Sequence, residues 1–146
     1  MRAYFFLIAS ALGALSFNPT NALAASEYRT SVEVFRIPRE EIPKLEAQAL
    51  GGSGDAAYRL SKFYEFLVLD IKEADYWLNI AAENDNPTAQ YGLGSRLSLS
   101  SDKREHLRAC YWLIKSKQKA SSEVSALADS VLARLTITCR QITSAP

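Results

Sequence analysis

The sequence predicts an all-α protein that folds as a short stack of antiparallel helix pairs. Through the middle of the chain, apolar residues recur at spacings of three and four, the period of a helix with one buried face. The pattern Ala-x-Tyr-Trp-Leu occurs twice, at Ala74–Leu78 and again at Ala109–Leu113, 35 residues later. A repeat of this length is typical of stacked helical hairpins, in which each hairpin buries its apolar face against the next.

Capping residues place the starts of the helices. Pro43 suits the first turn of a helix, where a backbone N–H has no partner to lose. Asp70 with Glu73, and Asp102 with Glu105, form candidate capping boxes at the starts of two further helices. The expected helices span residues 43–50, 55–66, 70–83, 87–99, 102–118 and 121 to about 137.

The two ends of this helical region differ in character. The last helix carries an apolar stripe at helical spacing, formed by Val124, Leu127, Ala128, Val131, Leu132 and Leu135. In residues 25–38, by contrast, Val32 and Val34 alternate with polar neighbours, and Ile37 is followed by Pro38. We therefore expect an extended or disordered arm there, with a short edge strand as an alternative.

Two connections between helices are rich in turn-forming residues. Gly51–Gly54 should be a flexible helix connection, because no strand precedes it and no Lys-Ser or Lys-Thr follows, as a phosphate-binding loop would require. Asn84 and Asn86 tolerate left-handed backbone better than most residues other than glycine, and Pro87 can open the next helix. The turn before Pro87 should therefore close without glycine.

The distribution of small and large residues suits close helix packing. Small residues stand where neighbouring helices should approach each other: Ala56, Ala74, Ala81, Ala82, Ala89, Gly92 and Gly94. Tyr76 with Trp77, and Tyr111 with Trp112, recur at equivalent places of the repeat. We expect all four rings to fill the core between the helices.

The segment Ala74–Gly94, ADYWLNIAAENDNPTAQYGLG, resembles the consensus of the Sel-one-like repeat family, a relative of the tetratricopeptide repeats. The resemblance covers roughly residues 40–135, with Asn84–Asn86 replacing the family's usual glycine turn. It implies a right-handed superhelical α-solenoid of about two repeats plus capping helices. Residues 39–140 would form this repeat domain, and residues 141–146 a tail.

The N-terminus has the order of a secretory signal peptide. Arg2 precedes an apolar run from Ala3 to Phe17, which is too short for a bilayer core that needs about 20 residues. Small residues follow, so cleavage after Ala24 is expected, with residues 1–24 removed. The sequence thus predicts a periplasmic or secreted protein that is not inserted in the membrane after cleavage.

The charge of the mature chain argues against two classes of partner. The leader would remove one basic residue, Arg2, from the 17 in the chain, leaving 16 basic and 16 acidic side chains. Binding to nucleic acid or to anionic lipid depends on an excess of Lys and Arg. We therefore expect neither nucleic acid nor a lipid surface as the partner.

The sequence shows no arrangement of residues typical of catalysis. A serine or cysteine nucleophile normally needs a histidine base, and the chain has one histidine, His106, beside Glu105 in an exposed first turn. One His and two distant Cys do not make a four-ligand zinc set. The sequence therefore predicts no catalytic residue, no metal site and no cofactor, and His106 is interpreted as a solvated surface residue.

The two cysteines, Cys110 and Cys139, would enter an oxidising compartment, where paired thiols commonly form a disulfide. They lie 29 residues apart on consecutive expected helices, so Cys139 could reach Cys110 only if the chain folds back after Leu135. The alternative is two separate, partly buried thiols.

A curved stack of helix pairs offers a partner-binding groove lined by the first helix of each pair. The candidate partner-binding residues are Arg59, Lys62, Phe63, Phe66, Gln90, Ser95 and Arg96. Their basic side chains suit an acidic rim on a partner, and exposed phenylalanines suit an apolar centre. The alternative interpretation is that Phe63 and Phe66 complete the core.

Four functions are compatible with these features. The resemblance implies an exported protein-binding module, such as an immunity protein that neutralises a secreted antibacterial toxin. An envelope adaptor or regulator, and a structural envelope component, would have the same sequence features. Cysteine-rich relatives that bind or hydrolyse β-lactams suggest an enzyme, but they carry a regular cysteine pair in each hairpin, which this chain lacks.

Overall fold

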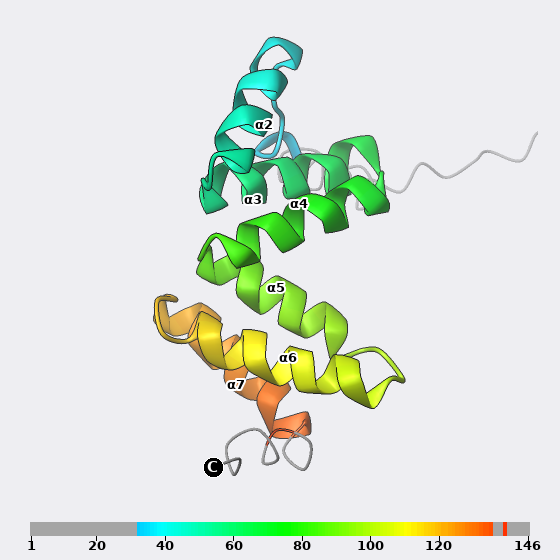
Figure 1. Ribbon diagram of the computed structural model, residues 1–146, viewed down its shortest axis with the longest axis vertical. Coiled ribbons are helices and arrows are strands. Elements are labelled where there is room, and N and C mark those ends of the chain that lie inside the picture. Colours follow the sequence, from blue (N-terminus) through cyan, green and yellow to red (C-terminus); the bar gives the residue numbers. More distant parts are fainter. Residues whose placement is uncertain (1–31, 136–138, 140–146) are drawn as a thin grey trace, which may run out of the picture. The chain divides into compact units, whose positions relative to one another are not determined.

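The computed structural model describes residues 32–135 and Cys139, and its regular secondary structure within them is entirely helical (Figure 1). The elements are η1 (Arg39–Glu41), α2 (Ile42–Leu50), α3 (Gly54–Phe63), η2 (Tyr64–Val68), α4 (Ile71–Glu83), α5 (Pro87–Leu97), α6 (Lys103–Ser116) and α7 (Ser122–Arg134). The predicted all-α class is confirmed. The predicted leader, the first part of the arm and the tail lie outside the described residues.

Each helix packs mainly against its neighbours in the chain. The pairs in contact are α2 with α3, α3 with α4, α4 with α5, α5 with α6, and α6 with α7 (Figure 1). Smaller contacts join α2 to α4 and α5 to α7. Helices α2–α7 therefore form one continuous series of packed helices.

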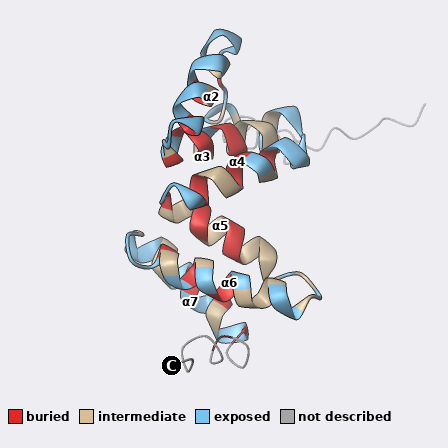
Figure 2. Ribbon diagram, in the orientation of Figure 1, coloured by how far each residue is buried: buried red, intermediate tan, exposed pale blue. Residues whose placement is uncertain are grey.

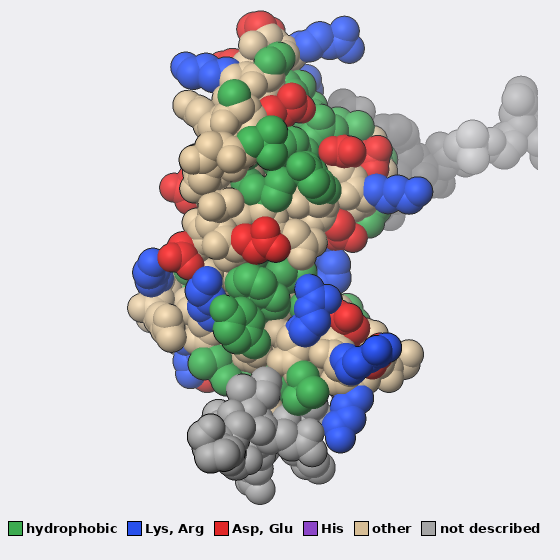
Figure 3. Space-filling view, viewed as in Figure 1, with side chains coloured by type: hydrophobic (Ala, Val, Ile, Leu, Met, Phe, Trp, Pro, Cys, Tyr) green, Lys and Arg blue, Asp and Glu red, His purple; other side chains and the backbone are tan. Residues whose placement is uncertain are grey.

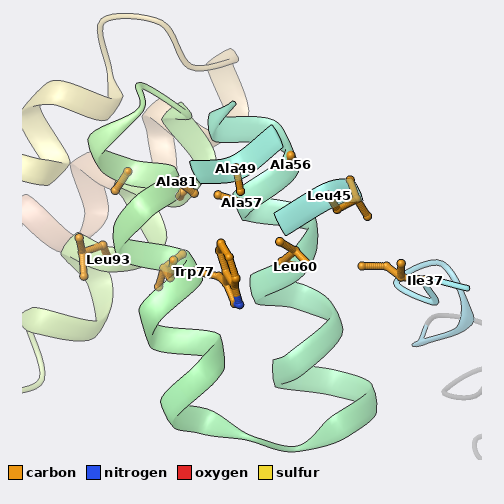
Figure 4. Packing of buried hydrophobic residues seen from close by; sticks show 12 residues of the cluster. Ile37, Leu45, Ala49, Ala56, Ala57, Leu60, Trp77, Ala81 and Leu93 are labelled. Atoms are coloured by element: carbon orange, nitrogen blue, oxygen red, sulfur yellow. The ribbon is translucent and has the colours of Figure 1, made fainter. Parts of the chain in front are cut away.

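The larger core cluster lies around α3 and α4. Figure 4 shows Trp77 projecting from α4 towards Ala57 and Leu60 of α3, with Ala49 of α2 nearby. The buried members of this cluster are Ile37, Leu45, Ala49, Ala56, Ala57, Leu60, Trp77, Leu78, Ala81, Ala82, Ala89 and Leu93. Alanines on both helices leave room for the large indole ring. Figure 2 shows that the buried residues of successive helices lie on the sides that face neighbouring helices.

The smaller cluster joins α6 to α7 and includes a disulfide. Its buried members are Ala109, Cys110, Leu113, Ala128, Val131, Leu135 and Cys139. Cys110 and Cys139 are bonded, with their Cα atoms 5.5 Å apart, so the structure favours the disulfide over two separate thiols. The expected return of the chain after Leu135 falls on residues 136–138, outside the described ones.

Five helices begin at a residue whose side chain accepts a hydrogen bond from a backbone N–H of the first turn. These capping residues are Ser53, Asp70, Asn86, Asp102 and Ser121. Asp70 Oδ1 accepts from the amides of Lys72 and Glu73, at 3.0 and 3.1 Å. Asp102 accepts instead from the amide of Arg104 at 2.8 Å. Neither predicted capping box is completed: the Asp70 amide donates to the Tyr64 carbonyl and not to Glu73, and the Glu105 carboxylate pairs with Arg108.

Two glycines are required by close approach of neighbouring elements. A Cβ on Gly54 would lie 2.4 Å from the carbonyl oxygen of Asn84, and one on Gly94 would lie 2.7 Å from Leu113 Cγ. The expectation of close packing is wrong for Gly92, where a Cβ would meet its nearest atom, Leu78 Cδ1, at 3.6 Å. Gly54 and Gly94 thus set the approach of α3 to the end of α4, and of α5 to α6.

The turn between α4 and α5 closes without glycine, as predicted, but by a different residue. Asp85 has the left-handed backbone, with φ 62°, whereas Asn84 and Asn86 have negative φ. Asn86 caps α5 instead: its Oδ1 accepts from the Ala89 amide at 2.8 Å, and its Nδ2 donates to Asp55 at 2.7 Å. The asparagine therefore satisfies two polar contacts that a left-handed conformation would lose.

The described part of the arm is not extended. The amide of Phe35 donates to the Val32 carbonyl, and that of Arg36 to the Glu33 carbonyl, both at 3.0 Å. These turns allow Ile37 to enter the larger core cluster, where it is 4% exposed. The prediction of an extended or edge-strand segment is wrong for residues 32–36. Burial of Ile37 stabilises the turns more than the short alternation of Val32 and Val34 with polar residues would stabilise a strand.

The four repeated rings do not share one environment. Trp77 is buried and Trp112 is partly buried against the larger cluster, but Tyr76 and Tyr111 are 50% and 51% exposed. Each tyrosine packs edge-on against its tryptophan, with centroids 4.9 and 5.0 Å apart. Adjacent helical residues point about 100° apart. The neighbours on the other side of the tryptophans, Leu78 and Leu113, are buried, which leaves each tyrosine on the outer side of its helix. The prediction that both tyrosines lie in the core is wrong.

Candidate functional site

A network of four charged side chains links α3, η2, α4 and α5. Lys62 Nζ lies 2.5 Å from Glu65 Oε2, Arg96 Nη2 lies 3.1 Å from Glu65 Oε1, and Arg96 also pairs with Asp75. Lys62 and Glu65 are mostly buried, which limits solvent screening of this pair. We call this network, together with Phe66, the α3–α5 face.

The aromatic part of the α3–α5 face is built around Phe66. Phe66 is 37% exposed and stacks on Phe35, with ring centroids 5.1 Å apart. Lys62 Nζ lies 5.4 Å from the centroids of both Phe66 and Tyr58. Burial, together with the nearby Glu65 carboxylate, raises the pKa of Tyr58. The face therefore holds an aromatic surface and a cation in fixed relative positions.

The structure brings together only some of the predicted partner-binding residues. Lys62, Phe66 and Arg96 lie together on the α3–α5 face. Arg59 is exposed and pairs with Glu41 at 3.5 Å. Phe63 packs against the larger core cluster, as the alternative interpretation had it.

The two other predicted residues of α5 are less accessible. Gln90 is only 2% exposed, and its amide nitrogen donates to the Ala82 carbonyl at 3.1 Å. It is a core residue that holds the end of α4, so the prediction that it faces a partner is wrong. Ser95 is half-buried.

A surface hollow on α6 was not predicted from the sequence. It has a volume of about 270 Å³ and is lined by Tyr111, Ile114, Lys115 and Gln118; we call it the tyrosine hollow. Lys115 Nζ also lies 5.4 Å from the centroid of the Trp112 ring. The sequence signal was present in the Ala-x-Tyr-Trp-Leu pattern, since a helical projection that turns Ala, Trp and Leu inwards leaves Tyr on the outer side.

The rim of the tyrosine hollow is tied to the turn between α4 and α5. Asp85 pairs with Lys115 at 2.9 Å and with Lys119 at 3.0 Å. Hydrogen bonds from these two ammonium groups lower the pKa of Asp85 from 3.8 to about 2. Two cations share one carboxylate, so the rim keeps an excess of positive charge. Figure 3 shows basic side chains gathered over α6 in the lower part of the view.

A second exposed apolar group lies between α3 and α4. Val68, Leu69 and Ile71 are all exposed, Leu69 most of all at 72%, and we call these three residues the apolar tip. Val68 is the last residue of the π-helical turn η2, Ile71 is the first of α4, and Leu69 between them has a left-handed backbone with φ 61°. Left-handed backbone is unfavourable for leucine, and both this conformation and π turns are found frequently at functional sites.

The described residues contain no group of His, Cys, Asp and Glu side chains placed to hold a metal ion. His106 is half-buried, and its Nε2 lies 2.6 Å from the Ser100 carbonyl oxygen, so it is not the fully solvated side chain that was predicted. Within residues 32–135, no helix combines the length and apolar character needed to cross a bilayer.

The fold and these surfaces define a class: an all-α protein of packed helices that presents aromatic and charged groups on its outer faces. No protein-family model, no curated protein and no solved structure matches the chain.

Proposed function

We propose that this chain is an exported protein-binding module, and that it binds its partner through the α3–α5 face. The observation that carries the proposal is Phe66, an exposed ring stacked on Phe35 and held beside the Lys62 ammonium group. Aromatic and arginine side chains dominate the binding energy of protein interfaces, and fixed side chains lose less entropy on binding.

The ion network supports this proposal in a further way. Glu65 holds both Lys62 and Arg96, so the charged groups around Phe66 are already positioned before a partner arrives. A partner would meet a face with paired charges and an apolar centre, which resembles the anatomy of many protein interfaces. An acidic rim on the partner is no longer needed, because Glu65 and Asp75 already neutralise the basic side chains.

We further propose that the helices stack as a Sel-one-like repeat solenoid. Packing between chain neighbours supports this arrangement, as do the repeated Ala-x-Tyr-Trp-Leu patterns, which place a tryptophan inwards in both α4 and α6. Resemblance to small exported members of that family makes an immunity protein for a secreted antibacterial toxin the leading candidate. An envelope adaptor is the alternative.

The test uses the purified protein as bait on a periplasmic extract. The proposal expects a partner in stoichiometric amount, lost with Phe66→Ala and retained with Leu127→Ala, a control on α7 with comparable exposure. A captured protein that is toxic in the periplasm, and harmless when this chain is present, identifies an immunity protein. A harmless partner points to an adaptor. Capture that Phe66→Ala leaves unchanged rejects the α3–α5 face, and no stoichiometric partner rejects the binding function.

A further inference from the structure

We propose that the protein associates with a second copy of itself head to tail, with the apolar tip of one molecule seated in the tyrosine hollow of the next. The proposal does not rest on the α3–α5 face, and it stands or falls separately from the binding of another protein. It follows from three observations: the shape of the two surfaces, their charge and their places in the fold.

The first observation is the match between the tip and the hollow. Leu69 and its neighbours Val68 and Ile71 project apolar surface into solvent from a strained turn. The tyrosine hollow is an open depression on α6 with a volume of about 270 Å³. A leucine side chain seated there would lie against Tyr111 and Ile114. Burying both surfaces removes apolar area from water on each side.

The second observation is that acidic and basic residues are distributed unevenly along the chain, although the mature chain is neutral overall. Residues 32–86 carry 11 acidic and 6 basic side chains, a net charge of −5. Residues 87–139 carry 4 acidic and 8 basic side chains, a net charge of +4. The tip belongs to the acidic half, where Asp70, Lys72 and Glu73 are exposed beside it with a net charge of −1, and the hollow belongs to the basic half. Each half is thus complementary to the other half of a second copy.

The third observation is the position of the two surfaces. In Figure 1 the connection between α3 and α4 lies at the right of the view, whereas the end of α6 lies at the left and lower down. One molecule can therefore offer its tip and receive another tip at the same time. Such a contact is heterologous, because the surfaces that meet are different ones, and it leaves one tip and one hollow free in a dimer.

The purified protein should show a concentration-dependent mass by light scattering, above that of a single chain and falling to it on dilution. Raising the salt from about 0.01 M to about 0.15 M shortens the screening length from about 30 Å to about 8 Å, so the association should weaken. Leu69→Asp and Ile114→Asp should each weaken the association at least about tenfold, as loss of a central interface contact does. Far-UV circular dichroism checks that both variants keep the helical fold.

Mixing the two variants distinguishes this arrangement from a symmetric dimer. Leu69→Asp keeps an intact hollow and Ile114→Asp keeps an intact tip, so the mixture should form dimers of one chain of each kind and nothing larger. A tip-to-tip dimer would survive in Ile114→Asp alone, and a hollow-to-hollow dimer in Leu69→Asp alone. Either result overturns the proposal. So does a single-chain mass for the unmodified protein at every concentration, or a mixture that stays monomeric.

Discussion

Gly54 lies at the first position of α3, against the carbonyl groups that end α4. A Cβ at this position would lie 2.4 Å from the Asn84 oxygen, 3.1 Å from the Asn86 nitrogen and 3.2 Å from the Ala81 oxygen. These are backbone atoms, which cannot rotate away as a side chain could. We expect Gly54→Ala to lower the free energy of unfolding by about 1–3 kcal/mol, measured by chemical denaturation.

The control for this prediction is Gly92→Ala in the middle of α5. Its new Cβ would meet Leu78 Cδ1 at 3.6 Å, an ordinary contact, and alanine favours a helix over glycine by about 1 kcal/mol. Gly92→Ala should therefore leave stability unchanged or raise it. Equal losses at both positions would show that close approach to α4 is not what requires Gly54.

Leu69 provides a second prediction at the residue scale. Its left-handed backbone costs leucine about 1–2 kcal/mol, and glycine avoids that cost but loses about 0.5–1 kcal/mol in chain entropy. Because the side chain is mostly exposed, little burial is lost, and Leu69→Gly should stabilise the protein by about 0.5–1 kcal/mol. Thermal and chemical unfolding measure the difference.

Leu69→Ala separates the two effects, because it shortens the side chain and keeps the strained Cβ. Leu69→Ala should therefore not raise the stability of the protein. If it raised the stability as much as Leu69→Gly does, the left-handed backbone would not be the source of strain. A protein that keeps a strained, exposed leucine which glycine would improve has traded stability for another property. Self-association through the apolar tip would be such a property.

At the scale of elements, capping residues allowed the helices to be predicted closely from the sequence. Residues 70–83 and 87–99 were predicted, and α4 and α5 begin within one residue of those starts, because Asp70 and Asn86 accept the N–H groups of the first turn. The π-helical turn η2 was missed. A π turn depends on how one turn of helix packs against its neighbours, and periodicity does not record that.

The site was harder to predict than the helices for a related reason. Gln90 is polar and was expected at the surface, yet its side-chain amide is buried and donates to the Ala82 carbonyl near the end of α4, which also accepts from the Asp85 amide. Tyr111 was expected in the core because the Tyr-Trp pair recurs at equivalent places of the repeat. For Gln90 the deciding fact is how α5 packs against the end of α4, which the sequence pattern does not record. For Tyr111 a helical projection of its own repeat pattern would have placed the ring outside.

Asp85 links the turn between α4 and α5 to α6, and this link should depend on pH. Hydrogen bonds from Lys115 and Lys119 lower its pKa from 3.8 to about 2 in the folded protein. A carboxyl whose pKa is lower in the folded state stabilises the fold above its unfolded pKa. That contribution is lost as the pH falls from about 4 through about 2, where the carboxylate becomes protonated.

Asp85→Asn tests this link, because asparagine tolerates the left-handed backbone and keeps a side-chain oxygen. The variant should be less stable than the unmodified protein at neutral pH, and the two should converge as the pH approaches 2. Added salt should also reduce the difference, since the ion pairs are solvent-exposed. If the difference in stability between the two proteins stayed constant from pH 7 to pH 2, the charge of Asp85 would not be its cause.

At the scale of the whole molecule, stability is divided between two core clusters of unequal size. The larger cluster spans α2 to α5 and contains Trp77 and many alanines, whereas the smaller one lies between α6 and α7 and contains the disulfide. A small cluster buries little apolar area, so a covalent link contributes a larger share of its stability. The disulfide should therefore matter most for the C-terminal part of the molecule.

Replacing both cysteines, as Cys110→Ala with Cys139→Ala, opens a loop of 29 residues in the unfolded chain. Loop-closure entropy predicts a loss of about 3–4 kcal/mol in the free energy of unfolding. A reducing agent should destabilise the unmodified protein by a similar amount and leave the double variant unchanged. Because α7 packs mainly on α6, amide exchange in α7 should accelerate far more than in α3. Equal acceleration in both helices would mean that the two clusters unfold as one unit, contrary to this division.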